Sequence, residues 1–248
     1  MEKNNAEKKN RIIDTEQGLK DYYECSADIV DYSKLSGRVL NQEQRRTETF
    51  INLMKLRKDE ELLDVGCGDG LQLEAFFKNN PRLQLSGVDI SEKRIERASK
   101  RVKGSLMVGS AYKLPFKSNF FDAVICSEVL EHVPNPGIIL SEISRVLKKK
   151  GVCMVSVPYR QTITYDICAY CGKLTPTSGH INFFDEEKIA LMLKNVGLSP
   201  LIVKGIIGSA SLSTPFRRIP YQLWRYLDWI IRKIRRDELY LIALAKKS

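Results

Sequence analysis

Short apolar runs alternate with amphipathic stretches along most of this chain, from Glu61 onward. The apolar runs predict seven strands, at residues 61–66, 83–90, 105–110, 121–129, 151–158, 199–207 and 238–245. Amphipathic stretches at residues 71–80, 91–102, 136–150 and 185–197 predict helices. This alternation predicts an α/β fold, with helices covering a doubly wound, mostly parallel seven-stranded sheet.

Several predicted helices carry signals at their ends. Ser91 and Asp185 are expected to cap helix N-termini, because a short side chain with an oxygen accepts a hydrogen bond from a free backbone N–H there. Gly151 and Gly197 are expected to end the helices that precede them.

The chain of 248 residues, 43% of them apolar, is long enough to bury the core of a single domain. Residues from about 1 to 57 predict two or three helices that form a cap over one edge of the sheet. The core is expected to comprise about 58–208 and 238–248. A basic amphipathic insertion, about 209–237, is expected before the last strand.

Composition narrows the function classes. The first ten residues are polar, and no apolar run is long enough to span a membrane, so we expect a cytoplasmic protein with reduced cysteines. The net charge of +10 comes mainly from the last 48 residues, which hold ten Lys and Arg against three Asp and Glu. No arginine-rich tract or zinc-finger array accompanies this charge, so a nucleic-acid substrate is not expected.

The stretch LLDVGCGDG ends the first predicted strand in a glycine-rich turn. In such a turn, free backbone N–H groups and the N-terminus of the following helix point at a bound ligand. Leu71 stands where a dinucleotide-binding G-x-G-x-x-G motif would have its third glycine. Asp89 ends the next strand, where a carboxylate can accept both hydroxyls of a ribose, although it also fits a helix cap before Ser91.

The run VGSAYKLPFKSNFFDAVICSEVLEHVPNP follows, at residues 108–136. Together with D-x-G-x-G-x-G and VDIS, it resembles the class I S-adenosylmethionine-dependent methyltransferases over about residues 55–200. The resemblance implies a Rossmann-like fold and S-adenosyl-L-methionine as the cofactor. The cofactor-binding positions that it implies are Asp64, Gly66, Gly68, Gly70, Asp89, Ile90, Ser110, Ala111 and Ser127.

The resemblance also implies a role for most of these positions. Asp64 and the three glycines would surround the methionine part, Asp89 would hold the ribose, and Ile90 would pack on the adenine. Ser110 stands where the family usually has an acidic residue. Its hydroxyl and the Ala111 N–H can still reach the adenine edge.

The two histidines of the chain are the candidate catalytic residues. His132 follows the fourth strand and could remove a proton from the acceptor, or it could simply fix the turn before Pro134. The resemblance also implies that His180, Phe183 and Phe184 could line the acceptor pocket, although the two phenylalanines could instead pack between the fifth strand and the next helix.

Cys168 and Cys171 form a C-x-x-C-Gly sequence. A structural zinc site needs four ligands, so His180 and Cys153 would have to complete it. We therefore assign no metal ligands and interpret the pair as two thiols.

The insertion contains an amphipathic helix over 220–236. Its apolar stripe comprises Leu223, Leu227, Ile230, Ile231 and Ile234. The opposite side carries Arg225, Asp228, Arg232, Arg235 and Arg236, with Trp229 among them. The stripe could pack on the domain, or the helix could lie on an anionic membrane and admit a lipid-like acceptor.

The sequence therefore predicts a methyltransferase that transfers a methyl group by in-line displacement to a small-molecule or lipid-like acceptor. Two alternatives remain open at this stage. One is a non-catalytic S-adenosylmethionine-binding protein of the same fold, and the other is a nicotinamide-dependent oxidoreductase.

Overall fold

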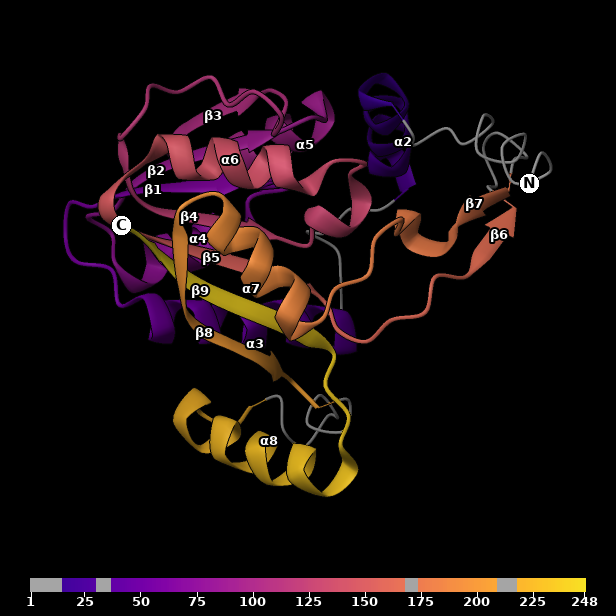
Figure 1. The fold of residues 1–248 in the computed structure, drawn as a ribbon. Helices are drawn as coiled ribbons and strands as arrows, with labels where there is room; N and C mark the ends of the chain where they lie inside the picture. The colour runs from indigo at the N-terminus through magenta and orange to yellow at the C-terminus, as the bar shows by residue number, and fades with distance from the viewer. Residues whose placement is uncertain (1–14, 30–36, 168–173, 209–217) are drawn as a thin grey trace.

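The computed structural model describes residues 15–29, 37–167, 174–208 and 218–248. A seven-stranded sheet with the order β3-β2-β1-β4-β5-β9-β8 forms its centre (Figure 1). Its strands are β1 (Glu61–Val65), β2 (Gln84–Asp89), β3 (Ser105–Val108), β4 (Phe121–Ser127), β5 (Leu147–Pro158), β8 (Leu198–Ile206) and β9 (Tyr240–Lys247). All pairings from β3 to β5 are parallel, whereas β9 runs antiparallel to both β5 and β8. The predicted α/β fold and its seven strands are confirmed.

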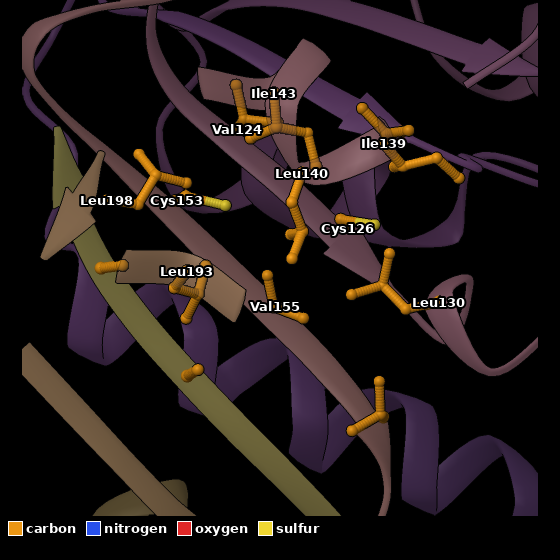
Figure 2. Close-up of a cluster of buried hydrophobic side chains, with 14 of the residues drawn as sticks. Val124, Cys126, Leu130, Ile139, Leu140, Ile143, Cys153, Val155, Leu193 and Leu198 are labelled. Atoms are coloured by element: carbon orange, nitrogen blue, oxygen red, sulfur yellow. The ribbon is translucent and has the colours of Figure 1, made fainter. Parts of the chain in front are cut away.

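Helices cover both faces of the sheet. On one face, α3 (Gly37–Met54), α4 (Leu71–Asn79) and α5 (Glu92–Arg101) share a buried cluster that includes Phe50, Phe76 and Ile125. On the other face, α6 (Pro136–Val146) and α7 (Glu186–Asn195) pack against β4 and β5. Figure 2 shows this second cluster, in which Leu140 and Leu193 lie over Val155.

The N-terminal part supplies two helices, α2 (Glu16–Ile29) and α3. We expected this part to cover one edge of the sheet, but α3 lies on a face. Phe50 and Met54 of α3 are buried in the same cluster as Leu62 of the central strand β1. Burial of these apolar side chains determines where α3 packs.

Three of the four predicted helix-end signals are confirmed. The side chains of Ser91 and Asp185 accept hydrogen bonds from the first turns of α5 and α7, and Gly197 follows α7 with a φ of +77°. Gly151 is the exception, since α6 ends at Val146 and Gly151 lies inside β5. A Cβ at position 151 would lie 3.0 Å from the Asp122 carbonyl oxygen, so the neighbouring strand requires the glycine.

A small two-stranded sheet, formed by β6 (Tyr165–Ile167) and β7 (Leu174–Pro176), was not predicted. Cys168 and Cys171 lie between these strands, outside the described residues.

The insertion before β9 forms the helix α8 (Tyr221–Arg235), as predicted, although residues 209–217 lie outside the described part. The apolar stripe packs on the protein only in part, since Leu227, Ile230 and Ile231 are half-buried. The buried residues of α8 are Trp224 and Asp228, whereas Leu223 and Ile234 are 53% and 76% exposed. Asp228 faces the protein because its carboxylate accepts hydrogen bonds from the Gly208 N–H and from Arg232.

In the part of the chain that the structure describes, no helix combines the length and apolar character needed to cross a membrane.

Candidate functional site

A cavity of about 400 Å³ opens at the carboxyl ends of β1, β2 and β4. The strand order reverses between β1 and β4, because β2 and β3 lie on one side of β1 and β4 and β5 lie on the other. Such a reversal leaves a crevice at the strand ends, where doubly wound proteins bind ligands.

The glycine loop forms one wall of this cavity. Gly66 and Cys67 donate backbone hydrogen bonds to the Val88 carbonyl, which holds the loop against β2. Gly66 has a φ of +76°, and a Cβ there would lie 2.4 Å from Val129 Cγ2, so only glycine fits. Gly68 also lines the cavity, but Gly70 does not, since it packs against Ala98 at the start of α4.

Two buried carboxylates end the first two strands. Asp64 is 2% exposed, and burial together with the nearby Asp89 carboxylate raises its pKa to about 7. Asp89 is 9% exposed and accepts hydrogen bonds from the Gly68 and Ser91 N–H groups. Burial raises the pKa of Asp89 as well. Both carboxyl groups line the cavity, where they form an acidic wall beside the glycine loop.

The other predicted cofactor-binding positions also line the cavity, namely Ile90, Ser110, Ala111 and Ser127. Ser110 Oγ accepts a hydrogen bond from the Tyr112 N–H at 3.1 Å, and Ser127 Oγ accepts one from Gln72 Nε2 at 3.1 Å.

The structure brings the two histidines together, although 47 residues separate them in the sequence. Their ring centroids lie 4.8 Å apart, and both side chains line the cavity. The Glu131 carbonyl accepts hydrogen bonds from the Ile181 and Asn182 N–H groups, which ties the segment after His180 to the turn after β4. Burial lowers the pKa of His132 to about 3, so this side chain is neutral at pH 7 and is a weak proton acceptor.

Charged residues outside the predicted set of site positions also line the cavity. Glu43 and Arg46 enter the cavity from α3, and Glu128 and Glu131 enter from the turn after β4. Arg46 is buried between Glu43, at 2.6 Å, and Glu128, at 3.7 Å. The spacing E-x-x-E-H at the end of a strand was a usable signal for the two glutamates, but nothing local indicated that α3 would reach the site.

Cys153, which a zinc site with the C-x-x-C pair would need as a ligand, lies in the interior of the protein. Its thiol is free and fully buried in the cluster between β5 and the helices α6 and α7 (Figure 2). Burial raises the pKa of Cys153 to about 12, which disfavours the thiolate that binds metals.

Comparisons with known proteins agree with the fold and the cavity. A family model described as a methyltransferase domain matches residues 63–155. The chain is 30% identical, over 195 residues, to a ubiquinone biosynthesis O-methyltransferase of Thiobacillus denitrificans, a match that covers 70% of this chain and 83% of that protein. It is 36% identical, over 138 residues, to the ubiquinone/menaquinone biosynthesis C-methyltransferase UbiE of Desulfotalea psychrophila, a match that covers 53% of this chain and 56% of that protein.

The fold is also found among solved structures. The crystal structure of an S-adenosylmethionine-dependent methyltransferase from Mesorhizobium loti aligns with a TM-score of 0.58 at 16% identity, over 81% of this chain and 98% of that one. Fold, cavity and relatives agree: this chain belongs to the class I S-adenosylmethionine-dependent methyltransferases, whose cofactor is S-adenosyl-L-methionine.

Proposed function

We propose that this protein transfers the methyl group of S-adenosyl-L-methionine to a small-molecule acceptor bound in the same cavity. The main support for this proposal is that the glycine loop, Asp64 and Asp89 together line one wall of a cavity of about 400 Å³. A volume of this size suits small-molecule ligands.

The residues of this wall fit the cofactor. Asp64 would hold its ammonium group, and Asp89 would accept hydrogen bonds from its ribose hydroxyls. Gly66 has no Cβ, and a Cβ at this position would clash with the Val129 side chain. Its absence also lets the backbone approach the methionine part of the cofactor. Ile90, Ser110 and Ala111 would contact the adenine. Gly68 and Ser127 would form the rest of the wall. Gly70 would hold the loop in place through its packing against Ala98.

Bound S-adenosyl-L-methionine supplies an electrophilic methyl group on a sulfonium. The acceptor atom forms a bond to the methyl carbon as the carbon–sulfur bond breaks, and the electron pair of that bond stays on sulfur. The protein contributes by aligning the acceptor with this bond and by excluding water, and such positioning can lower the barrier by roughly 7–11 kcal/mol.

The acceptor is proposed to be a quinone precursor or a molecule of similar chemistry. Relatives of this chain are named for ubiquinone and menaquinone biosynthesis. His132 and His180 line the same cavity, where the Tyr23 ring of α2 lies against His132, and they would contact the acceptor. Because His132 is a weak base, we infer that it contacts or orients the methyl acceptor but does not accept a proton from it.

Contact with an anionic membrane through 220–236 would bring a lipid-like acceptor to this enzyme. The outward side of α8 exposes Leu223, Tyr226, Trp229 and Ile234, each at least 50% exposed. Arg225, Lys233, Arg235 and Arg236 are exposed on the same helix. Apolar and aromatic side chains among cations suit the interface of an anionic bilayer.

Calorimetry with S-adenosylhomocysteine tests the cofactor site. We expect binding in the micromolar range, about −8 kcal/mol, and no binding of NAD. Asp89→Asn should weaken this binding at least tenfold, because an amide cannot replace both oxygen acceptors, whereas the exposed control Asp59→Asn should bind normally.

Transfer of a labelled methyl group to hydroxylated aromatic acceptors then tests the reaction. Transfer that requires the intact Asp89 side chain would support the proposal. Tight binding of S-adenosylhomocysteine without transfer to any quinone precursor would favour a non-catalytic binding protein and would contradict the proposal.

A further inference from the structure

Three side chains with metal-binding atoms meet in the cavity. Glu131 and His132 belong to the short 3-10 turn η2 (Leu130–His132), and His180 follows a second turn, η3 (Thr177–Gly179). One ligand atom from each of the three lies within 4.8 Å of the others. His132 Nε2 and Glu131 Oε1 are 3.6 Å apart.

Glu131 is the most unusual of these groups. Its side chain is 1% exposed, and among the described residues neither carboxylate oxygen has a hydrogen-bond partner. The residue nevertheless lines the cavity. A buried carboxylate without partners is costly, so such a group indicates a ligand that the protein binds there.

Both histidines are oriented for metal binding by contacts on their other nitrogen. His132 Nδ1 lies 3.2 Å from the Gly179 carbonyl oxygen, and His180 Nδ1 lies 2.6 Å from Gln161 Oε1. Oxygen acceptors of this kind place the proton on Nδ1 and leave the lone pair of Nε2 free. Metal-binding histidines characteristically donate their second N–H to a carbonyl or carboxylate in this way.

The charges of the surroundings also favour a cation. Glu128, three residues before Glu131, lines the same cavity and adds a second carboxylate. Arg46 lies 3.7 Å from Glu128 but forms its shorter ion pair with Glu43, at 2.6 Å.

We propose that Glu131, His132 and His180 bind one divalent transition-metal ion, such as Zn²⁺ or Mn²⁺, with Glu128 as a further carboxylate at its side. Two imidazoles and one carboxylate form the ligand set of open metal sites, which leave positions for water or substrate. The mixed nitrogen and oxygen donors favour a transition metal over Mg²⁺ or Ca²⁺, which take oxygen ligands.

The ion would bind the acceptor oxygen as a Lewis acid. This catalytic role rests on the proposed function, whereas the binding of the metal by the protein does not. Coordination lowers the pKa of a bound hydroxyl, so the proton leaves to bulk water before methyl transfer. The resulting oxyanion then forms its bond to the methyl carbon.

Titration of the EDTA-treated full-length protein with Co²⁺ tests the site directly. We expect one ion per chain by calorimetry, with the absorption of nitrogen and oxygen ligation and no thiolate charge-transfer band. Glu131→Gln and His180→Asn should each weaken binding by at least about tenfold. Glu187→Gln, on the exposed side of α7, and the double change of Cys168 and Cys171 to Ser should leave it unchanged.

Three results would overturn the proposal: no Co²⁺ binding, binding that Glu131→Gln and His180→Asn both leave intact, or a thiolate band that vanishes in the cysteine variant. Binding of S-adenosylhomocysteine, measured on every variant, shows whether the cavity remains folded. If the wild-type protein binds Co²⁺ but not S-adenosylhomocysteine, the proposed function fails while the metal site stands.

Discussion

Asp64 shows how burial at the end of a strand prepares a single side chain for its ligand. Its carboxyl group is enclosed by the sheet, and the neighbouring Asp89 carboxylate disfavours a second negative charge. Arg46 acts in the opposite direction but is shared with Glu43 and Glu128. The pKa of about 7 therefore places the ionisation of Asp64 within the physiological range.

This pKa predicts pH-dependent cofactor binding. Below pH 7 the Asp64 carboxyl is protonated and offers no charge to an ammonium group, whereas above pH 7 it is ionised. Affinity for S-adenosylhomocysteine should therefore rise about tenfold between pH 6 and pH 8, because the ionised fraction of a group with this pKa rises by that factor. Calorimetry at the two pH values measures the change.

Asp64→Asn is the control for this prediction. The amide does not titrate, so the variant should bind more weakly at pH 8 and show a much flatter pH profile. Equal affinities of the wild-type protein at pH 6 and pH 8 would show that Asp64 does not contact the ammonium group.

Among the helices, α8 packs on the protein through a side that its sequence pattern did not favour. Trp224 is buried, with the Arg45 guanidinium 4.9 Å from its ring centroid and the Tyr221 ring at 5.9 Å. Arg232 adds a hydrogen bond to the Gly205 carbonyl and an ion pair to Asp228. Trp224 and the Asp228–Arg232 ion pair thus hold α8 on the protein, and Leu227, Ile230 and Ile231 of the aliphatic stripe are half-buried beside them.

The two tryptophans of α8 provide a matched test of this orientation. Trp224→Ala should lower the free energy of unfolding by roughly 3–5 kcal/mol, because it leaves a cavity in the core. Trp229 is 50% exposed and stacks on Tyr226. Trp229→Ala should therefore change the free energy of unfolding by no more than about 0.5 kcal/mol. Urea unfolding measures both, and a larger effect at Trp229 would show that α8 is rotated.

The molecule as a whole places its cavity and its exposed helix on different elements. The cavity lies at the carboxyl ends of the strands and is lined in part by residues of α2 and α3. Helix α8 lies beyond the β8 side of the sheet (Figure 1). Membrane contact through α8 would therefore orient the molecule without requiring α8 to enter the cavity. Association with membranes and binding of the cofactor should then be separable by mutation.

Sedimentation with vesicles tests this separation. The wild-type protein should pellet with anionic vesicles at low salt, should be released as salt screens the charges, and should not pellet with neutral vesicles. Replacing Trp229 and Ile234 with Ser should abolish pelleting while S-adenosylhomocysteine still binds. Leu191→Ser, at a 56% exposed position on α7, is the control that should still pellet.

Pelleting of the double variant at the wild-type level would show that α8 is not the contact surface. A wild-type protein that stays in the supernatant with both kinds of vesicle would contradict membrane contact altogether.

The sequence by itself determined the strands, most helix ends and the glycine loop with Asp64 and Asp89. These features are encoded locally, because apolar periodicity, capping side chains and glycine turns act over a few residues. Only the tertiary structure decided which segments that are distant in the sequence contact one another. It brought His180 to Glu131 and His132, sent Arg46 of α3 into the cavity, and turned Trp224 and not Leu223 toward the core. Burial and hydrogen-bond partners depend on the whole fold, and no local pattern contains them.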